Sequence, residues 1–359
     1  MNVVYMIKIR EATEEDNQTL IELQTKCPQG TSIILNIDSS PDFFARSKPF
    51  KDWAVLIALD NSKAVGSAGY AINEVLVGGK PAKIAYEYGF MVDPRERRKG
   101  IATKLQERVE QDMEEKGVDL LCLTIIEDNT PSFGLFSKMG FRKIKDCATF
   151  SLMAYKKQTL TKENSIRSAK ESDLGEVATM LNNMYRGYDF FHPLTAEDLL
   201  DYVGRMPGFD LNSLFIFEDD QGMKACLGCW DYTKVRRYIV QKFNWRLKTQ
   251  LSLLKLAGLF TVMPRIPKSG EPLLSYNLTL LAFKDAESMT DLIRYAINMA
   301  VRNRISLLHV PLDLENPAAE ILSHFRHSRI GLQFLVKPLL GRASPSFDAN
   351  KLYLDATEI

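Results

Sequence analysis

The chain has 359 residues, and its 46 lysines and arginines nearly balance its 45 aspartates and glutamates, giving a formal net charge of +1. This balance excludes an overall attraction to nucleic acid or to an anionic membrane, so binding must depend on local patches. The 45% hydrophobic and 25% charged content is ordinary for a globular protein. No apolar run approaches the ~18 residues of a membrane-spanning helix, and the length favours two domains.

The N-terminus and the cysteines predict a cytoplasmic location. The stretch from Met1 to Ile9 is too short and too polar for a secretory signal. Five cysteines, an odd number without the spacing of a disulfide framework, are typical of a reducing compartment.

The first part of the chain is predicted to form a strand, a helix and then several further strands. A short strand over residues 7–10 is followed by Thr13 and Asp16, which predict an N-terminal helix cap. Alternation and turn residues then predict strands over residues 53–59, 64–77 and 84–92.

An abrupt change from strand to helix follows Val92. Pro94 cannot donate to a sheet ladder and ends the strand. Apolar residues then repeat at helical spacing, and Gly117 supplies a stop. These apolar positions are Ile101, Leu105, Val109 and Met113.

The start of this helix has the features of an anion site. Backbone N–H groups in a first helical turn lack internal partners, and the helix dipole is positive there. Three cationic residues precede the turn, while Gly100 allows close approach of a ligand and Ala102 leaves room beside it. The cations are Arg97, Arg98 and Lys99. A pyrophosphate group is a suitable ligand for such a turn.

The spacing Arg97-x-x-Gly100-x-Ala102, preceded by Phe90-Met91-Val92, resembles motif A of the GNAT superfamily of N-acetyltransferases. Downstream come an apolar strand over residues 120–126, then Asn129 and a helix ending in Gly140-Phe141, similar to the closing segment of that superfamily. Residues ~7–150 fit the superfamily pattern from end to end.

The resemblance implies a bound acetyl-CoA. In the superfamily this turn holds the pyrophosphate, and a splayed strand leaves N–H groups free to bind pantetheine and polarise the thioester carbonyl. Phe136 stands where many relatives carry a tyrosine that acts as general acid, so it can pack against the cofactor but cannot donate a proton. Asn129 also fits a simple helix-capping turn. The cofactor-binding residues expected are Met91, Val92, Arg97, Arg98, Lys99, Gly100, Ile101, Ala102, Thr103, Asn129, Ser132 and Phe136.

Glu87 is the candidate catalytic residue. It lies in an otherwise apolar strand, where desolvation raises the pKa of a carboxyl toward the range of a general base. Such a base would take the proton from the attacking amine. The alternative is a structural pair with Lys83 or Arg142 on a sheet face.

The second part of the chain repeats features of the first. Residues 166–173 share the pattern Ile-Arg-x-Ala-x-x-x-Asp with residues 9–16, and a strand over 307–314, Asn316 and residues 331–334 echo the closing segment. We therefore predict an α/β (α+β) fold of two tandem GNAT-like domains. Each has a mixed, mostly antiparallel sheet flanked by helices. Residues 1–157 form the acyl-CoA-binding domain and residues 165–359 a degenerate one, in which Lys284-Asp285-Ala286-Glu287 replaces the phosphate turn.

Two other features favour structural interpretations. Cys226 and Cys229 form an isolated C-x-x-C in an apolar segment, which predicts buried thiols in a strand; no metal site is expected. The basic stretch over 232–270 has apolar residues at helical spacing and predicts an amphipathic helix. It either covers the second domain or binds an acidic substrate, a membrane surface or nucleic acid.

The function predicted is an acetyl-CoA-dependent N-acetyltransferase, whose acceptor amine attacks the thioester directly in a ternary complex. The acceptor is a small molecule or a peptide, and neither a specific nucleic acid partner nor a membrane span is expected. Two alternatives stay open: an acyl-CoA-binding regulatory module with little or no turnover, and a longer acyl-CoA as donor. The sequence leaves the oligomeric state open.

Overall fold

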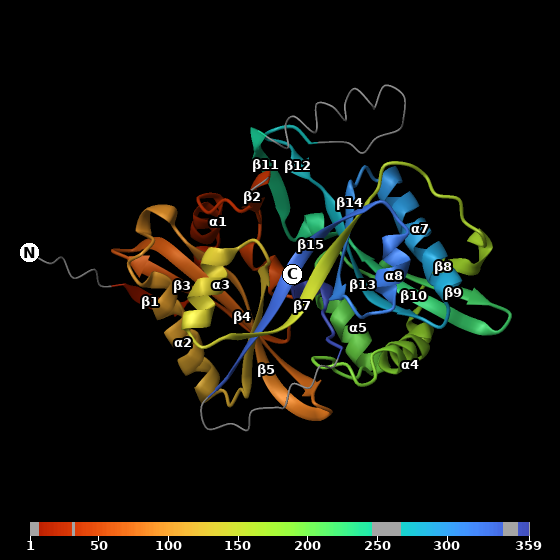
Figure 1. Ribbon diagram of the computed structural model, residues 1–359, viewed down its shortest axis with the longest axis horizontal. Helices are drawn as coiled ribbons and strands as arrows, with labels where there is room; N and C mark the ends of the chain where they lie inside the picture. The colour runs from red at the N-terminus through yellow and green to blue at the C-terminus, as the bar shows by residue number, and fades with distance from the viewer. Residues whose placement is uncertain (1–6, 31–32, 246–266, 340–350, 359) are drawn as a thin grey trace, which may run out of the picture.

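The computed structural model describes residues 7–30, 33–245, 267–339 and 351–358. Most strands join one twelve-stranded, mostly antiparallel sheet, and helices pack on it. In Figure 1 the first half, coloured red to yellow, and the second half, green to blue, lie side by side along this sheet. The predicted α/β class is confirmed, and the two expected sheets are joined edge to edge.

The first half contains seven strands and three α-helices among the described residues. The predicted strands and helices occur, and a further strand starts at Arg142 with polar residues. The strands are β1 (Lys8–Glu11), β2 (Ile33–Asp38), β3 (Asp52–Asp60), β4 (Lys63–Val77), β5 (Lys80–Val92), β6 (Leu120–Ile126) and β7 (Arg142–Met153), and the helices are α1 (Asn17–Thr25), α2 (Ile101–Glu115) and α3 (Thr130–Lys138).

The second half repeats this alternation. Its strands are β8 (Ile166–Ser168), β9 (Leu214–Asp219), β10 (Gly222–Trp230), β11 (Arg237–Phe243), β12 (Pro272–Leu273), β13 (Ser275–Phe283), β14 (Leu307–Asp313) and β15 (His327–Pro338). Its helices are α4 (Leu174–Met184), α5 (Ala196–Arg205), α7 (Ala286–Arg302) and α8 (Ala318–Ser323). Strands β12, β11 and β2 form a separate three-stranded sheet that links the halves.

The two halves exchange their last strands. The order of the large sheet is β1-β3-β4-β5-β6-β15-β7-β14-β13-β10-β9-β8, so β15 lies between β6 and β7, and β7 lies between β15 and β14. In Figure 1, β7 and β15 run together through the centre of the molecule. Each half therefore completes the sheet of the other.

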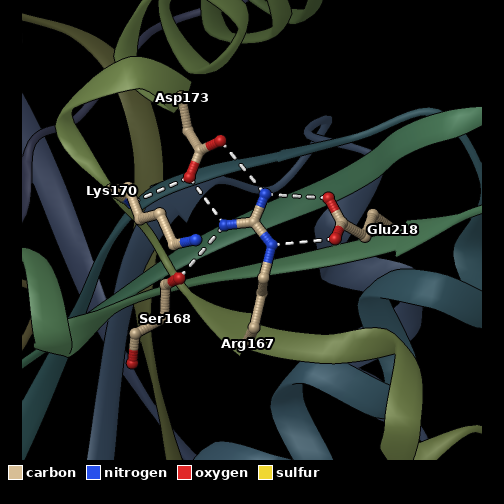
Figure 2. Close-up of polar contacts among 5 residues, drawn as sticks. All are labelled: Arg167, Ser168, Lys170, Asp173 and Glu218. Carbon is tan, nitrogen blue, oxygen red and sulfur yellow. Dashed lines mark hydrogen bonds and ion pairs between the residues drawn. The ribbon is translucent and has the colours of Figure 1, made fainter.

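The repeated Ile-Arg-x-Ala-x-x-x-Asp pattern builds the same structure twice. Arg10 donates to both carboxylate oxygens of Asp16, at 2.6 and 2.8 Å, and Arg167 does the same to Asp173, at 2.6 and 3.0 Å. Figure 2 shows Arg167 between Asp173 and Glu218. Asp16 also accepts from the N–H of Thr13 at the predicted helix cap. The shared geometry supports an internal duplication.

The predicted amphipathic helix in the basic segment is wrong over its described part. Residues 237–243 form strand β11, which pairs antiparallel with β2. The apolar residues that suggested a helix, Val235, Ile239 and Phe243, recur every four residues, and this spacing fits one face of a strand as well. Residues 246–266 lie outside the described residues.

The predicted buried thiols are confirmed. Cys226 and Cys229 are free and fully or almost fully buried in β10. Among the described residues, no group of histidine, cysteine, aspartate and glutamate side chains is placed to hold a metal ion. In the same ranges no helix has both the length and the apolar character needed to cross a bilayer.

The core around strand β5 draws on both halves. On one face, α2 buries its predicted apolar stripe together with Leu335 and Leu339 of the second half. On the other face, Tyr86 and Tyr88 pack in a cluster with Phe334 of β15 and with Leu352 near the C-terminus. The second half therefore covers the face of β5 that α2 leaves open.

The strand exchange predicts that residues 1–157 will not fold alone. Without β15, strands β6 and β7 lack the partner that lies between them, and Leu335 and Val336, both fully buried, lose their place in the core. We expect residues 1–157 expressed alone to be unfolded or aggregated by circular dichroism and size-exclusion chromatography. Co-expression with residues 158–359 should recover a soluble complex; a folded, monomeric first half would contradict the exchange as a stability requirement.

Candidate active site

The bend between β5 and α2 is built by local capping. Asp93 accepts from the backbone N–H of Arg95 at 2.9 Å and starts a short 3₁₀ turn, Pro94–Glu96. The chain then reaches α2 through Arg98 and Gly100, which have φ values of +65° and +76°. Gly100 is suited to this left-handed conformation, and no heavy atom beyond its chain neighbours lies within 4 Å of the point where a Cβ would stand.

The start of α2 is open to a ligand. No side chain of the described residues caps this helix at Gly100, and Arg97, Arg98, Lys99 and Gly100 are all exposed. Lys99 pairs with Glu96 at 2.6 Å. The uncapped N–H groups and the exposed guanidinium groups form a positively polarised surface that suits a diphosphate.

The corresponding helix of the second half has no such opening. At the start of α7, Asp285 accepts from the backbone N–H of Ser288 at 2.8 Å. A carboxylate of the protein therefore already occupies the anion position. This supports the prediction that only the first half binds acyl-CoA.

Strands β5 and β6 separate beside the bend. Their parallel pairing spans only Ile84↔Leu120 to Tyr86↔Cys122, although β5 continues to Val92. A bulge against β4, where Gly89 has a φ of +64°, redirects this part of β5. Met91 and Val92 are half-buried beyond the last pair. The divergence of two neighbouring strands that the resemblance implied is therefore present. We call the region between β5 and β6 beyond their last pair, Tyr86↔Cys122, the splay.

The other predicted cofactor residues lie on α3, next along the sheet. Asn129 accepts from the backbone N–H of Ser132 at 3.3 Å, so its carbonyl oxygen caps the helix. Phe136 is buried, with its ring 5.1 Å from that of Phe90 and 5.4 Å from that of Phe141. The structure thus brings the β5–α2 bend and the α3 N-terminus to the same edge of the splay.

Glu87 is buried, with 2% of its surface exposed, and faces α2. Its Oε1 accepts from Gln106 Nε2 at 2.9 Å, while Glu87 Oε2 and Gln106 Oε1 lack partners within the described chain. Burial raises the pKa of Glu87 to about 8. A neutral carboxyl group carries an O–H, the kind of donor that Gln106 Oε1 lacks. The alternative pairing with Lys83 or Arg142 does not occur.

A polar chain links Glu87 to the second half. Gln106 Nε2 also donates to Glu110 at 3.2 Å, and Lys337 of β15 donates to the same Glu110 oxygen at 2.6 Å. Sequence reasoning missed Lys337, because only the strand exchange brings it to α2.

In the second half the corresponding strands, β13 and β14, also diverge, but the C-terminal segment lies between them. Strands β13 and β14 pair only from Ser275↔Leu307 to Asn277↔His309. Beyond that point the C-terminal segment enters: Leu352 N–H donates to Asp313 at 2.8 Å, and Asn277 donates to the carbonyl of Ala356 at 3.4 Å. The segment lines a small cavity together with β13 and β14.

Comparison with known proteins identifies the domain in which these residues lie. Residues 17–141 match the model of the acetyltransferase (GNAT) family. No curated protein matches the sequence. Among solved structures, the N-myristoyltransferase of Saccharomyces cerevisiae with bound myristoyl-CoA is similar over 98% of this chain and 88% of its own, with a TM-score of 0.66 and 12% identity.

Another similar structure is a GCN5-related glucosamine N-acetyltransferase region of a fungal multi-domain GH3 β-N-acetylglucosaminidase. It aligns with 93% of this chain and 38% of its own, with a TM-score of 0.61 and 13% identity. At these identities the structural likenesses establish the fold. The family match adds that residues 17–141, which contain the β5–α2 bend and α3, form a GNAT acetyltransferase domain.

Proposed function

We propose that the protein transfers an acetyl group from acetyl-CoA to an amine, by direct attack of the amine in a ternary complex. The observation that carries this proposal is the uncapped, cationic start of α2 at the end of a splayed strand. The pyrophosphate of CoA would bind the N–H groups of residues 101–103 and the side chains of Arg97 and Arg98. Pantetheine would then run into the splay between β5 and β6.

The specificity has two components, the acyl group of the donor and the amine that accepts it. The yeast neighbour was solved with myristoyl-CoA, and the fungal neighbour is described as a glucosamine N-acetyltransferase region. We infer a small-molecule or peptide amine as acceptor and the cytoplasm as the site of action. An assay of CoA release, with donors from acetyl-CoA to myristoyl-CoA and amines of each class, tests the proposal.

Glu87 remains our candidate for the general base. A carboxyl with a pKa of about 8 exchanges its proton near the pH at which an amine becomes nucleophilic. Because Glu87 is buried, the proton from the amine would reach it through water in the splay. The competing function, a module that binds acyl-CoA without turnover, is favoured by Phe136, which has no hydroxyl to protonate the leaving thiolate.

Removing the guanidinium groups at the bend should weaken CoA binding. We expect Arg97→Ala and Arg98→Ala each to raise the Kd for CoA about tenfold at low salt, because each removes a charge-assisted contact to phosphate. Isothermal titration calorimetry measures this, and the difference should shrink as ionic strength rises. Arg95→Ala, an exposed arginine in the preceding 3₁₀ turn, is the matched control. Equal affinities in all four proteins would contradict the assigned phosphate site.

Glu87 should also impose a pH dependence on stability. Its pKa is about 8 in the folded protein and about 4.5 when unfolded. Between these values the folded state keeps a proton that the unfolded state releases, so stability is fully present below pH ~4.5 and falls as pH rises toward 8. In Glu87→Gln this decline should be absent, and the two proteins should diverge by at most about 1.4 kcal/mol per pH unit. Urea titrations at several pH values, with exposed Glu107→Gln as control, measure it; parallel profiles would refute a buried neutral Glu87.

The same variant separates the two functions. If Glu87 is the general base, Glu87→Gln should lower kcat about a hundredfold or more while leaving the Kd for CoA unchanged. The wild-type rate should rise with pH through about 8, where the base loses its proton. Wild-type turnover that Glu87→Gln leaves intact would show that the residue is structural. Tight CoA binding without turnover of any amine would favour the regulatory module.

A further inference from the structure

Two arginines from different halves meet on the face of β5 opposite α2. Arg46 ends the 3₁₀ turn Phe43–Arg46 in the first half, and Arg236 precedes β11 in the second. The guanidinium carbon of Arg46 lies 4.8 Å from the ring centre of Tyr88, and that of Arg236 lies 5.8 Å from the ring centre of Tyr232. Burial raises the pKa of Tyr88 to about 12, and the charges of both arginines oppose this rise. Ala45, next to Arg46, packs in the same core cluster as Tyr232 and Val235, so the two arginines lie in one region of the molecule.

This cluster has no counter-charge among the described residues. Neither Arg46 nor Arg236 forms an ion pair there, and the Nε atom of each is buried without a hydrogen-bond partner. Their surroundings are phenolic: the rings of Tyr88 and Tyr232 lie beside them, and Tyr88 donates to Ser47 at 2.7 Å.

The nearby carboxylates are engaged elsewhere. Asp38 pairs with Arg237 at 2.6 Å, and Asp42 pairs with Lys48. Asp231 accepts from the hydroxyl of Thr233 at 2.5 Å. Two half-buried cations without an anion are costly for a folded protein. A ligand with a carboxylate or phosphate group would supply the missing anion, because guanidinium groups form strong charge-assisted hydrogen bonds with both.

The cluster lies beside the proposed reaction site. Tyr88 follows Glu87 directly and precedes the bulge at Gly89, in the part of β5 that no longer pairs with β6. A group held by Arg46 and Arg236 would therefore lie beside the splay, on the face away from α2. The second half supplies Arg236.

We propose that the acceptor amine carries a compact anionic group, a carboxylate or a phosphate, and that Arg46 and Arg236 bind this group between the two halves. This inference rests on the proposed N-acyl transfer, because it assigns the acceptor of that reaction. The amine end of the molecule would point into the splay.

Matched pairs of amines test the proposal on the full-length protein. β-Alanine is compared with its neutral amide, 3-aminopropanamide, and O-phosphoethanolamine with ethanolamine. Binding is measured by calorimetry or by ligand-detected NMR. We expect the member with the carboxylate or phosphate group in one pair to bind at least about tenfold more tightly than the partner that lacks this group, and the pair that discriminates identifies the group. No discrimination within either pair would overturn the proposal.

Single substitutions then locate the effect. Arg46→Met and Arg236→Met should each remove the discrimination, whereas Arg237→Met, the neighbouring arginine already paired with Asp38, should keep it. Since each of the first two removes an uncompensated charge, neither should lower the thermal midpoint of the free protein. A lower midpoint with discrimination retained would show a structural role and overturn the proposal. If one variant fails to fold, the other gives the same test from the opposite half.

CoA binding by the same proteins separates this inference from the proposed function. Arg46→Met and Arg236→Met should bind CoA as the wild type does, because both residues lie on the face of β5 away from α2. Wild-type protein that binds CoA but does not distinguish the amines overturns only the anion site. Wild-type protein that distinguishes the amines but binds no acyl-CoA overturns the proposed transferase, and with it the assignment of the anion as part of an acceptor.

Discussion

The exchange of β7 and β15 is the constraint on which the rest of the structure depends. Because β15 fills the gap between β6 and β7, the second half is held in one orientation against the first. This orientation brings Lys337 to Glu110 on one face of β5 and sets Phe334 and Leu352 against Tyr86 on the other. The splay between β5 and β6 thus has one wall from α2 and another from the second half. The donor end of the proposed site belongs to the first half, and its acceptor end depends on both.

The two halves share a framework but differ at the start of the helix that follows the bulged strand and in the splay beside it. Both keep the Arg–Asp pair at their first strand, a single parallel strand pair that separates, and a bulge beside that separation. In the first half the bulge uses Gly89, whereas the second uses Leu280 with a φ of +48°, a conformation that costs a leucine about 1–2 kcal/mol. The second half has also capped its helix with Asp285 and filled its splay with its own C-terminal segment.

Local patterns in the sequence predicted the bend that we propose as the donor site, and long-range contacts explain what those patterns missed. The bend from Val92 to Ala102 is set by neighbouring residues. Pro94, Gly100 and the apolar residues at helical spacing after Gly100 were therefore sufficient to predict it. The position of β15 was not predictable, because its alternating pattern fits a strand at many places in a sheet and its neighbours are chosen by the fold. Strand β11 was mistaken for a helix because a spacing of four residues suits both structures. Arg46 and Arg236 lie far apart in the sequence, and neither has a local partner that would mark it.

Hydrogen–deuterium exchange of the amides at residues 101–103 tests the central claim most directly, since these N–H groups are the proposed ligands of the pyrophosphate. In the free protein they lack capping partners and should exchange rapidly. Saturating acetyl-CoA should slow their exchange strongly, while Ser288 at the start of α7, already bonded to Asp285, should not change. Unchanged exchange at residues 101–103 with acetyl-CoA bound would contradict the account, because the cofactor would then lie elsewhere.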